Sequence, residues 1–266
     1  MTSAHALRDS STMLRRNLRH MRRYPSTTSF QILLPVVFLL LFVYVFGATL
    51  GNGLPTMAAG RAGYVNYVAP AIILLTVAGG ATSTAISVAT DMNEGIIDRF
   101  RTMAIWRPSV LAGHVAAAMI QTLLAVAVVI AVALGVGFRP HAGALGWLGA
   151  AGVLAMVTLA LTWLGVVSGL AAKSLESASN TPMLLMLLPF LGSGFVPTAS
   201  MPAGLRQFAT YQPFTPFTDA LRGLLDGGPT GGHLLVSAAW CAGIAIIGYV
   251  WSVKRYSRGP RVPPAQ

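Results

Sequence analysis

Six long windows of this sequence contain no Asp, Glu, Lys or Arg. A helix needs roughly 20 apolar residues, each rising about 1.5 Å, to cross the hydrocarbon core of a bilayer, so each window can hold one span. A mean hydropathy of +0.67, with only 9% charged residues, excludes a soluble globular protein with a charged exterior. The windows are residues 24–60, 62–90, 108–138, 140–172, 177–205 and 227–253.

These windows predict an all-α membrane protein with a single transmembrane domain, 1–266, and six transmembrane helices. Six spans place both termini on the same side of the membrane, and cationic flanks are retained on the cytoplasmic side. The side that holds the termini carries fourteen Lys and Arg residues against four on the other, so both termini are predicted to be cytoplasmic. The expected spans are about 30–50, 65–89, 110–136, 145–171, 180–200 and 233–253.

The same charges bear on partners and location. The net charge of +11 flanks the spans instead of forming one basic surface, which suits anionic membrane lipids and argues against nucleic acid. Sixteen Arg against two Lys is typical of a GC-rich bacterial genome, so we expect a multi-pass protein of a bacterial cytoplasmic membrane. The first apolar run, ILLPVVFLLLFVYVF, is longer than a signal-peptide core and is interpreted as an uncleaved span.

Residues 1–25 predict a basic amphipathic helix on the cytoplasmic membrane surface. Leu14, Leu18 and Met21 recur at i, i+4 and i+7, while most of the arginines point elsewhere. The alternative is a disordered basic tail that serves only to orient the chain. The arginines assigned to this interfacial helix are Arg15, Arg16, Arg19, Arg22 and Arg23.

The fourth window carries Gly165 and Gly169 four residues apart. Small residues at that spacing let two helices approach closely in lipid, where packing and weak polar contacts drive association. The pattern favours close packing inside the molecule, and a contact between subunits stays open as the alternative.

The fifth window is interrupted by proline and glycine. A helix broken at membrane depth leaves amides and carbonyls without partners, so the break must be buried in protein or border a water-filled path. We therefore expect a functional role near this break. Its residues are Pro189, Gly192, Gly194 and Pro197.

The segment that follows, 201–230, is too polar to span the membrane but contains many Phe, Leu and Pro residues. These predict a half-inserted, re-entrant helical hairpin at the outer interface. Within it, Arg222 and Asp226 stand at i and i+4, where their side chains can pair.

Residues 91–107, between the second and third spans, concentrate charge. The stretch DMNEGIIDRFRTM holds five of the chain's twenty-five charged residues. Asp91-x-x-Glu94 is typical of a capping box and predicts that a helix begins there. On that helix Glu94, Asp98 and Arg101 share one side, and their mixed charge suits a protein partner better than anionic lipid. The alternative is a solvated connecting helix.

No energy source is evident within the spans. Pumps driven by H⁺ or Na⁺ usually carry Asp, Glu or Lys inside their spans, and the six windows hold none. Neither Lys173 nor Lys254 follows the glycine that precedes the lysine of a P-loop. His114 stands alone near the cytoplasmic end of the third span, where a packing or interface role is expected. Uphill transport would therefore need energy from another polypeptide.

Patterns for catalysis and for metal binding are not found either. The sequence has no H-E-x-x-H, and no Ser/His pair at similar membrane depth is evident. The acids near residue 98 lack neighbours typical of a metal cage. The single cysteine, Cys241, cannot form a disulfide within the chain. We predict that the chain is not an enzyme and has no metal site.

Three regions resemble the permease subunits of type-2 ABC exporters, and most closely the daunorubicin-resistance branch of that family. They are LRRNLRHMRRYP before the first span, NEGIIDRFRTMAIWRPSVLAGHV after the second, and GFVPTASMPAGLRQFATYQPFTPFTDALRGLLDGGP near the end. Ala104 departs from the proline that relatives often have, which bears only on the local bend after the charged segment.

The resemblance implies two permease subunits, identical or paralogous, that dock on two cytoplasmic ATPases, which bind ATP and Mg²⁺. It also implies export of an amphiphilic drug, antibiotic or lipid-like molecule, with no cofactor in this chain. The charged segment would be a coupling helix seated in a cleft of the ATPase and braced by the N-terminal helix. By the same resemblance, the interrupted fifth span, with the prolines and glycines named above, and the outer hairpin would border the exit gate. The residues assigned to ATPase coupling are Asp91, Glu94, Gly95, Asp98, Arg99, Phe100 and Arg101.

Two alternatives stay open. Polysaccharide and glycolipid exporters share the topology, and Trp147 and Trp163 are too few aromatic residues to decide for a saccharide path. A motor-independent membrane scaffold or channel is a different class. A neighbouring gene for a P-loop ATPase would argue against that class.

Overall fold

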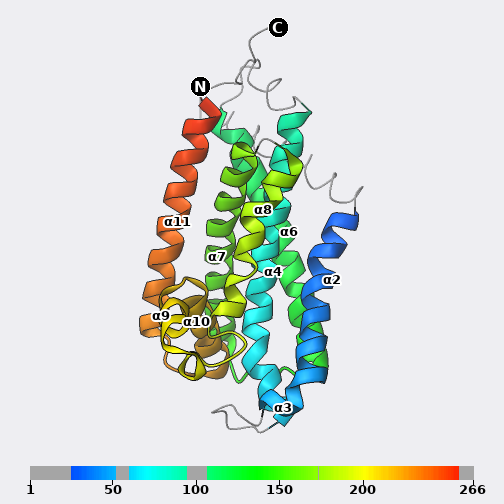
Figure 1. Ribbon diagram of the computed structural model, residues 1–266, viewed down its shortest axis with the longest axis vertical. Coiled ribbons are helices and arrows are strands. Elements are labelled where there is room, and N and C mark those ends of the chain that lie inside the picture. The colour runs from blue at the N-terminus through cyan, green and yellow to red at the C-terminus, as the bar shows by residue number, and fades with distance from the viewer. Residues whose placement is uncertain (1–24, 52–59, 95–106, 173, 258–266) are drawn as a thin grey trace.

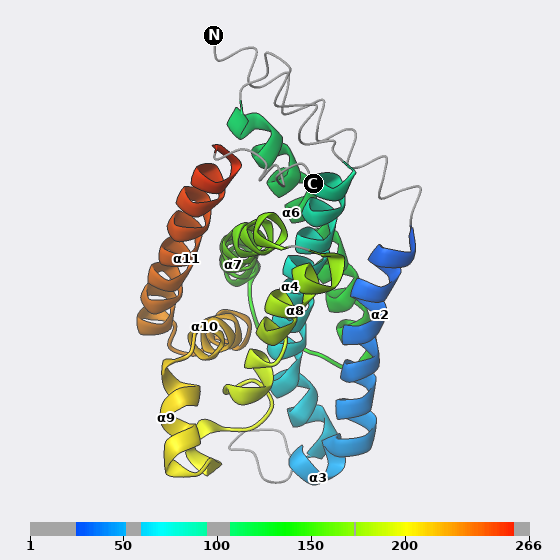
Figure 2. The ribbon, with the colours of Figure 1, turned by 45° about the horizontal axis from the view of Figure 1, so that its top comes forward.

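The computed structural model describes residues 25–51, 60–94, 107–172 and 174–257, and the regular structure in those ranges is helical, as predicted (Figure 1 and Figure 2). The start of α2 and the end of α11 lie at the same end of the bundle. The helices are α2 (Pro25–Leu41), η1 (Phe42–Phe46), α3 (Gly47–Gly51), α4 (Gly60–Asn93), α6 (Arg107–Val136), α7 (Ala144–Ala171), α8 (Leu175–Leu185), η2 (Leu188–Leu191), η3 (Thr198–Ser200), α9 (Ala203–Tyr211), α10 (Phe214–Asp226) and α11 (Gly231–Ser257).

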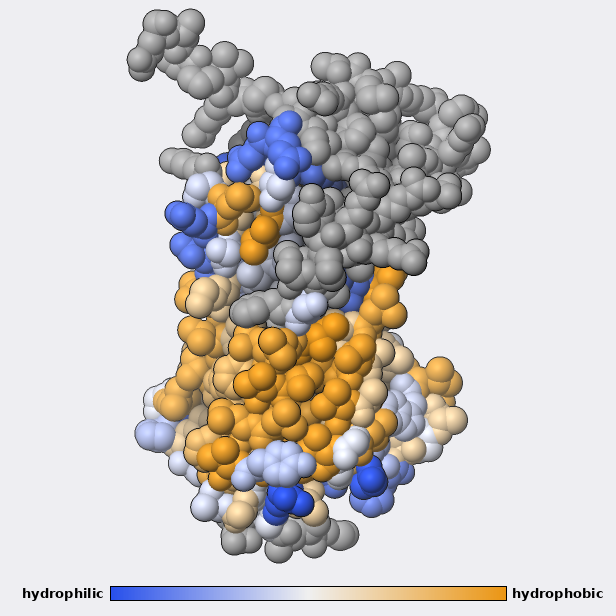
Figure 3. Space-filling view, turned by 90° about the vertical axis from the view of Figure 1, so that its right-hand side faces the viewer, coloured by the Kyte–Doolittle hydropathy of each residue, from blue (hydrophilic) through white to orange (hydrophobic). Residues whose placement is uncertain are grey.

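Five of the described helices are long and apolar enough to cross a membrane, and they coincide with five of the six predicted spans. On the face shown in Figure 3, apolar side chains form a broad central surface with hydrophilic residues near its two ends. This pattern is typical of a multi-pass membrane protein. The first, Gln31–Gly51, runs without a break through α2, η1 and α3. The other four are Gly60–Asn93, Leu111–Val136, Ala144–Ala171 and Gly231–Arg255.

The fifth window is not one continuous helix, which confirms the predicted interruption. α8 ends at Leu185, and η2, a turn and η3 follow. α8 begins at Leu175, before the predicted span start near residue 180. The reason is a capping box: the Ser174 hydroxyl accepts from the Ser177 amide at 3.2 Å, and the Ser177 hydroxyl accepts from the Ser174 amide at 3.0 Å.

α4 is the central helix of the bundle and packs against α2, α6, α7, α8 and α10. Glycines of α7 allow one of these contacts. A Cβ on Gly165 would lie 2.4 Å from the carbonyl oxygen of Ala81, and one on Gly169 would lie 2.6 Å from that of Ala85. Only glycine admits so close an approach of the two backbones. The glycine pair therefore packs within the molecule, as the sequence favours.

The predicted helix start at Asp91 is wrong. α4 continues through Asp91, and the amide of Glu94 still donates to the carbonyl of Thr90 at 2.9 Å. Asp91 lies in the last turn of a helix that is already formed, so its side chain has no helix start to cap. The rest of the charged segment, 95–106, lies outside the described residues, as does the predicted interfacial helix up to residue 24.

The segment after the interruption forms two short helices, α9 and α10, as the hairpin prediction requires (Figure 2). Its half-insertion into the outer interface stays a prediction. The predicted pairing of Arg222 with Asp226 is wrong, because Arg222 pairs with Asp219, at i−3 on the same helix. α9 is mostly exposed, whereas α10 buries Phe214, Thr215, Pro216, Phe217, Thr218, Ala220, Leu221 and Leu225.

We expect Gly165→Leu to destabilise the protein, because the new side chain would force α7 away from α4. Overpacking of this kind costs about 1–3 kcal/mol. Gly152→Leu is the matched control on the same helix, since a Cβ there meets nothing within 4 Å. Thermal unfolding of the detergent-purified variants measures the difference. Equal melting temperatures for the two variants would contradict the packing described here.

Candidate functional site

Aromatic side chains join the first span to the interrupted segment. Phe42–Phe46 in the first span is a π-helical turn, a distortion that proteins often place at functional sites. The ring centroid of Phe42 lies 4.6 Å from that of Phe195, and Phe195 stacks on Phe190 at 4.5 Å. Phe38 adds an edge contact with Phe190 at 5.5 Å. The two segments therefore pack together through one aromatic cluster.

The structure places the predicted gate residues against α4 and α10. Pro189, Gly192 and Gly194 are buried, whereas Pro197 is partly exposed. A Cβ on Gly192 would lie 2.3 Å from Gln212 Nε2, and one on Gly194 would lie 2.6 Å from a side chain of α4. Both glycines therefore let the interrupted chain run close to its neighbours. Their role in gating stays a proposal.

Side chains from the neighbouring helices provide partners for backbone groups near the break. Gln212 Nε2 donates to the carbonyl of Leu188 at 3.2 Å, and the Ser193 amide donates to Thr215 Oγ1 at 3.2 Å. The Ser193 carbonyl accepts from the hydroxyl of Tyr67 at 2.8 Å. Lipid could not supply these hydrogen bonds. These backbone groups are therefore buried in protein, which is one of the two environments expected for such a break; the other is a water-filled path.

The guanidinium of Arg222 is the centre of a polar cluster with Asp219, Tyr67 and Ser193, which we call the Arg222 anchor. Nη1 lies 2.9 Å from Asp219 Oδ1, and Nη2 donates to the carbonyls of Tyr67 and Ser193, each at 3.1 Å. The guanidinium carbon also lies 4.0 Å from the centroid of the Tyr67 ring, a cation–π contact. The Ser193 hydroxyl donates to Asp219 Oδ1 at 2.8 Å. One side chain of α10 thus holds both α4 and the interrupted segment.

The Arg222 anchor is largely withdrawn from solvent, with 20% of the Arg222 side chain and 23% of the Asp219 side chain exposed. Charge pairs gain strength as the surrounding dielectric falls, and removing one partner leaves the other uncompensated. Sequence reasoning missed this anchor because Asp219 and Asp226 both lie within about one turn of Arg222. The i, i+3 spacing was a usable signal, but only the fold shows which side of α10 faces α4.

At the opposite end of α4, Asp91 Oδ2 lies 3.1 Å from Nε2 of His114, near the start of α6. Both side chains are almost completely buried. The contact joins the two helices that flank the segment 95–106. Asp91 therefore points into the bundle, whereas Glu94 is exposed. Sequence reasoning expected His114 to have a packing or interface role and did not pair it with Asp91.

A third polar contact lies between α2, α4 and α6. Gln31 Nε2 donates to Thr122 Oγ1 at 3.3 Å, and both residues are buried. A Cβ on Gly80 would lie 2.2 Å from that Thr122 oxygen, so glycine is needed where α4 passes the contact. Sequence reasoning missed it because it tracked charged residues and read Gln and Thr as part of an apolar window.

The other predicted site residues lie outside the described residues, and their roles stay predictions. Within the described ranges, no three His, Cys, Asp or Glu side chains lie together as metal ligands would, and Cys241 is a buried free thiol. The residues outside are Gly95, Asp98, Arg99, Phe100 and Arg101 of the coupling segment, and Arg15, Arg16, Arg19, Arg22 and Arg23 of the interfacial helix.

We expect Arg222→Lys to destabilise the protein although it keeps the charge, because an ammonium cannot reproduce the planar fork that serves three acceptors. Removing one charge of a buried pair costs about 3–5 kcal/mol; because lysine keeps the charge and the pair is partly exposed, we expect a smaller loss. Arg206→Lys is the control, since Arg206 is exposed and its hydrogen bonds to described residues go to nearby carbonyls of its own segment, those of Ala199 and Met201. Thermal unfolding in detergent measures both. An equally small loss in both variants would show that the anchor adds little.

Comparison with known proteins places the chain in a family. Residues 9–225 match the ABC-2 type transporter family. The chain is 28% identical over 245 residues to a daunorubicin resistance ABC transporter permease protein of Streptomyces coeruleorubidus, covering 92% of this chain and 83% of the relative. It is 26% identical over 212 residues to a probable doxorubicin resistance ABC transporter permease protein of Mycobacterium tuberculosis, covering 80% and 76%. The chain therefore belongs to the ABC-2 type transporter family, as a non-catalytic, multi-pass permease subunit of the cell membrane.

Proposed function

We propose that the chain is the membrane-spanning subunit of an ATP-driven exporter for an amphiphilic drug, antibiotic or lipid-like molecule. The observation that carries this proposal is the similarity, over 92% of the chain, to a permease named for daunorubicin resistance. The apolar character of the spans supports it, because an apolar path with a few polar groups suits an amphiphile.

A permease of this family implies an ATPase partner, and that partner binds the ATP and Mg²⁺. We infer two copies of the ATPase and a second permease subunit, identical or paralogous. The segment 91–107 is where we expect the ATPase to dock, with Glu94, Asp98 and Arg101 offering charges of both signs. Because Asp91 is buried against His114, we infer that it holds the start of this segment in place and does not itself contact the ATPase.

α4 offers a direct path from the docking segment to the proposed gate. Tyr67 and Asp91 lie about 36 Å apart along one uninterrupted helix. At one end Asp91 contacts His114, and at the other Tyr67 contacts Ser193 and Arg222. A shift of α4 when the ATPases close would therefore change the geometry of the interrupted segment. Such a shift of a packed helix between two arrangements is a common form of conformational switch.

Export is tested with inverted membrane vesicles that contain this permease and its partner ATPase. We expect ATP-dependent uptake of daunorubicin or of a fluorescent lipid analogue. Reversing the charges of Glu94, Asp98 and Arg101 together should abolish both co-purification of the ATPase and uptake, because the docking surface would repel its partner.

Reversal of the charges of Arg258 and Arg261 in the C-terminal tail is the matched control, since it changes charge on the same predicted side and leaves the sequence of the docking segment unchanged. Co-purification of the ATPase and uptake should both survive that change. Unchanged co-purification and uptake in the triple variant would refute the coupling role. Absence of ATP-dependent uptake of either probe by the intact complex would refute the proposed export of amphiphiles.

A further inference from the structure

The last helix, α11, is fixed against α7 by one of its faces. A Cβ on Gly248 would lie 2.9 Å from the Cβ of Trp163, so the helices approach closely there. The ring of Tyr249 meets that of Trp163 edge-on, with centroids 5.2 Å apart. Near the end of the helix, Arg255 Nε donates to the carbonyl of Leu170 at 3.2 Å. These contacts determine which side chains of α11 point away from the rest of the protein.

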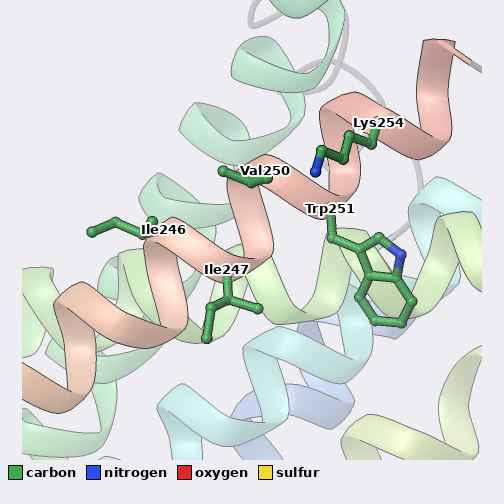
Figure 4. A pocket seen from close by; sticks show the side chains of 5 residues that line it. All are labelled: Ile246, Ile247, Val250, Trp251 and Lys254. Atoms are coloured by element: carbon green, nitrogen blue, oxygen red, sulfur yellow. The ribbon is translucent and has the colours of Figure 1, made fainter.

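The outward side of α11 carries a shallow apolar groove that ends in a cation (Figure 4). Ile246 and Ile247 are 63% and 68% exposed, far more than buried core residues. The side chain of Lys254 runs back along the helix, so that its ammonium nitrogen points toward the side of Val250 and Trp251 (Figure 4). The residues that line the groove are Ile246, Ile247, Val250, Trp251 and Lys254.

The position of the groove along α11 matches one leaflet of a bilayer. From Ile246 to Lys254 the helix rises about 12 Å, less than half of the roughly 30 Å hydrocarbon core. Lys254 lies in the last turn of α11, on the predicted cytoplasmic side. Tryptophan is enriched at headgroup level, which is where Trp251 then lies. The apolar lining therefore faces acyl chains, and the ammonium faces headgroups.

We propose that this groove binds one anionic phospholipid of the cytoplasmic leaflet, with an acyl chain along the isoleucines and the headgroup phosphate at Lys254. A partner helix fits less well, because the lining has no Gly, Ala or Ser, the residues that allow helices to pack closely in lipid. A zwitterionic lipid offers the same acyl chain, but a net negative headgroup gains more from a fixed cation. The proposal depends on the placement of α11 in the membrane and holds whatever molecule is exported.

Trp251 lines the groove and can report its occupancy by fluorescence. We expect brominated phosphatidylglycerol to quench Trp251 more strongly than the same mole fraction of brominated phosphatidylcholine in reconstituted vesicles. Lys254→Gln should lower this preference about five-fold, the contribution of one lysine near an anionic surface. The full chain is used, and the tryptophans replaced by Phe to isolate the signal are Trp106, Trp147, Trp163 and Trp240.

Lys173→Gln is the matched control, because Lys173 is the only other lysine in the sequence, and it should leave the preference unchanged. Equal quenching by the two lipids, or an equal fall in both lysine variants, would overturn the proposal. Native mass spectrometry avoids the Trp replacements. The protein with all its tryptophans should retain phosphatidylglycerol over phosphatidylcholine, and Lys254→Gln should lose that excess. Retention of both lipids alike would also overturn the proposal.

Discussion

A helix that breaks inside a bilayer leaves backbone groups that lipid cannot hydrogen-bond, and the end of this protein that holds the break is built around that requirement. The Ser193 carbonyl is the clearest case, because it accepts from both Tyr67 and Arg222. Asp219 balances the charge that Arg222 brings into this partly buried place. Side chains of α10 therefore supply hydrogen bonds that the interrupted fifth window needs. This explains why so much of an apparently peripheral helix is buried.

α4 connects the two ends of the molecule. α4 supplies Tyr67 to the break, and its last turn supplies Asp91 to the contact with α6. Between these points it is packed on several sides, and glycines of α7 hold it close. A helix held at both ends by polar contacts and along its length by close packing moves as a unit more readily than it bends. In an ABC permease this makes α4 the best candidate for carrying movement from the ATPase to the proposed gate.

Much of the architecture could be predicted from the sequence, because five spans and one interruption follow from hydropathy and from the backbone chemistry of Pro and Gly. The predictions that were wrong depend on the direction in which a side chain points. Asp91 at the end of α4 looks like a helix cap in sequence but turns inward to His114, and Arg222 has an acid on either side within about a turn. Gln31 and Thr122 carry no charge, so a search for charged residues passed over their contact.

Hydrogen–deuterium exchange of the permease–ATPase complex tests most directly whether movement of α4 reaches the break. Exchange is compared with and without Mg²⁺ and a non-hydrolysable ATP analogue. Peptides that contain residues 188–196 should change their exchange when nucleotide binds, while the packed middle of α7 should not. Unchanged exchange over 188–196, in a complex that exports its substrate, would contradict the coupling of the ATPase to the interrupted span.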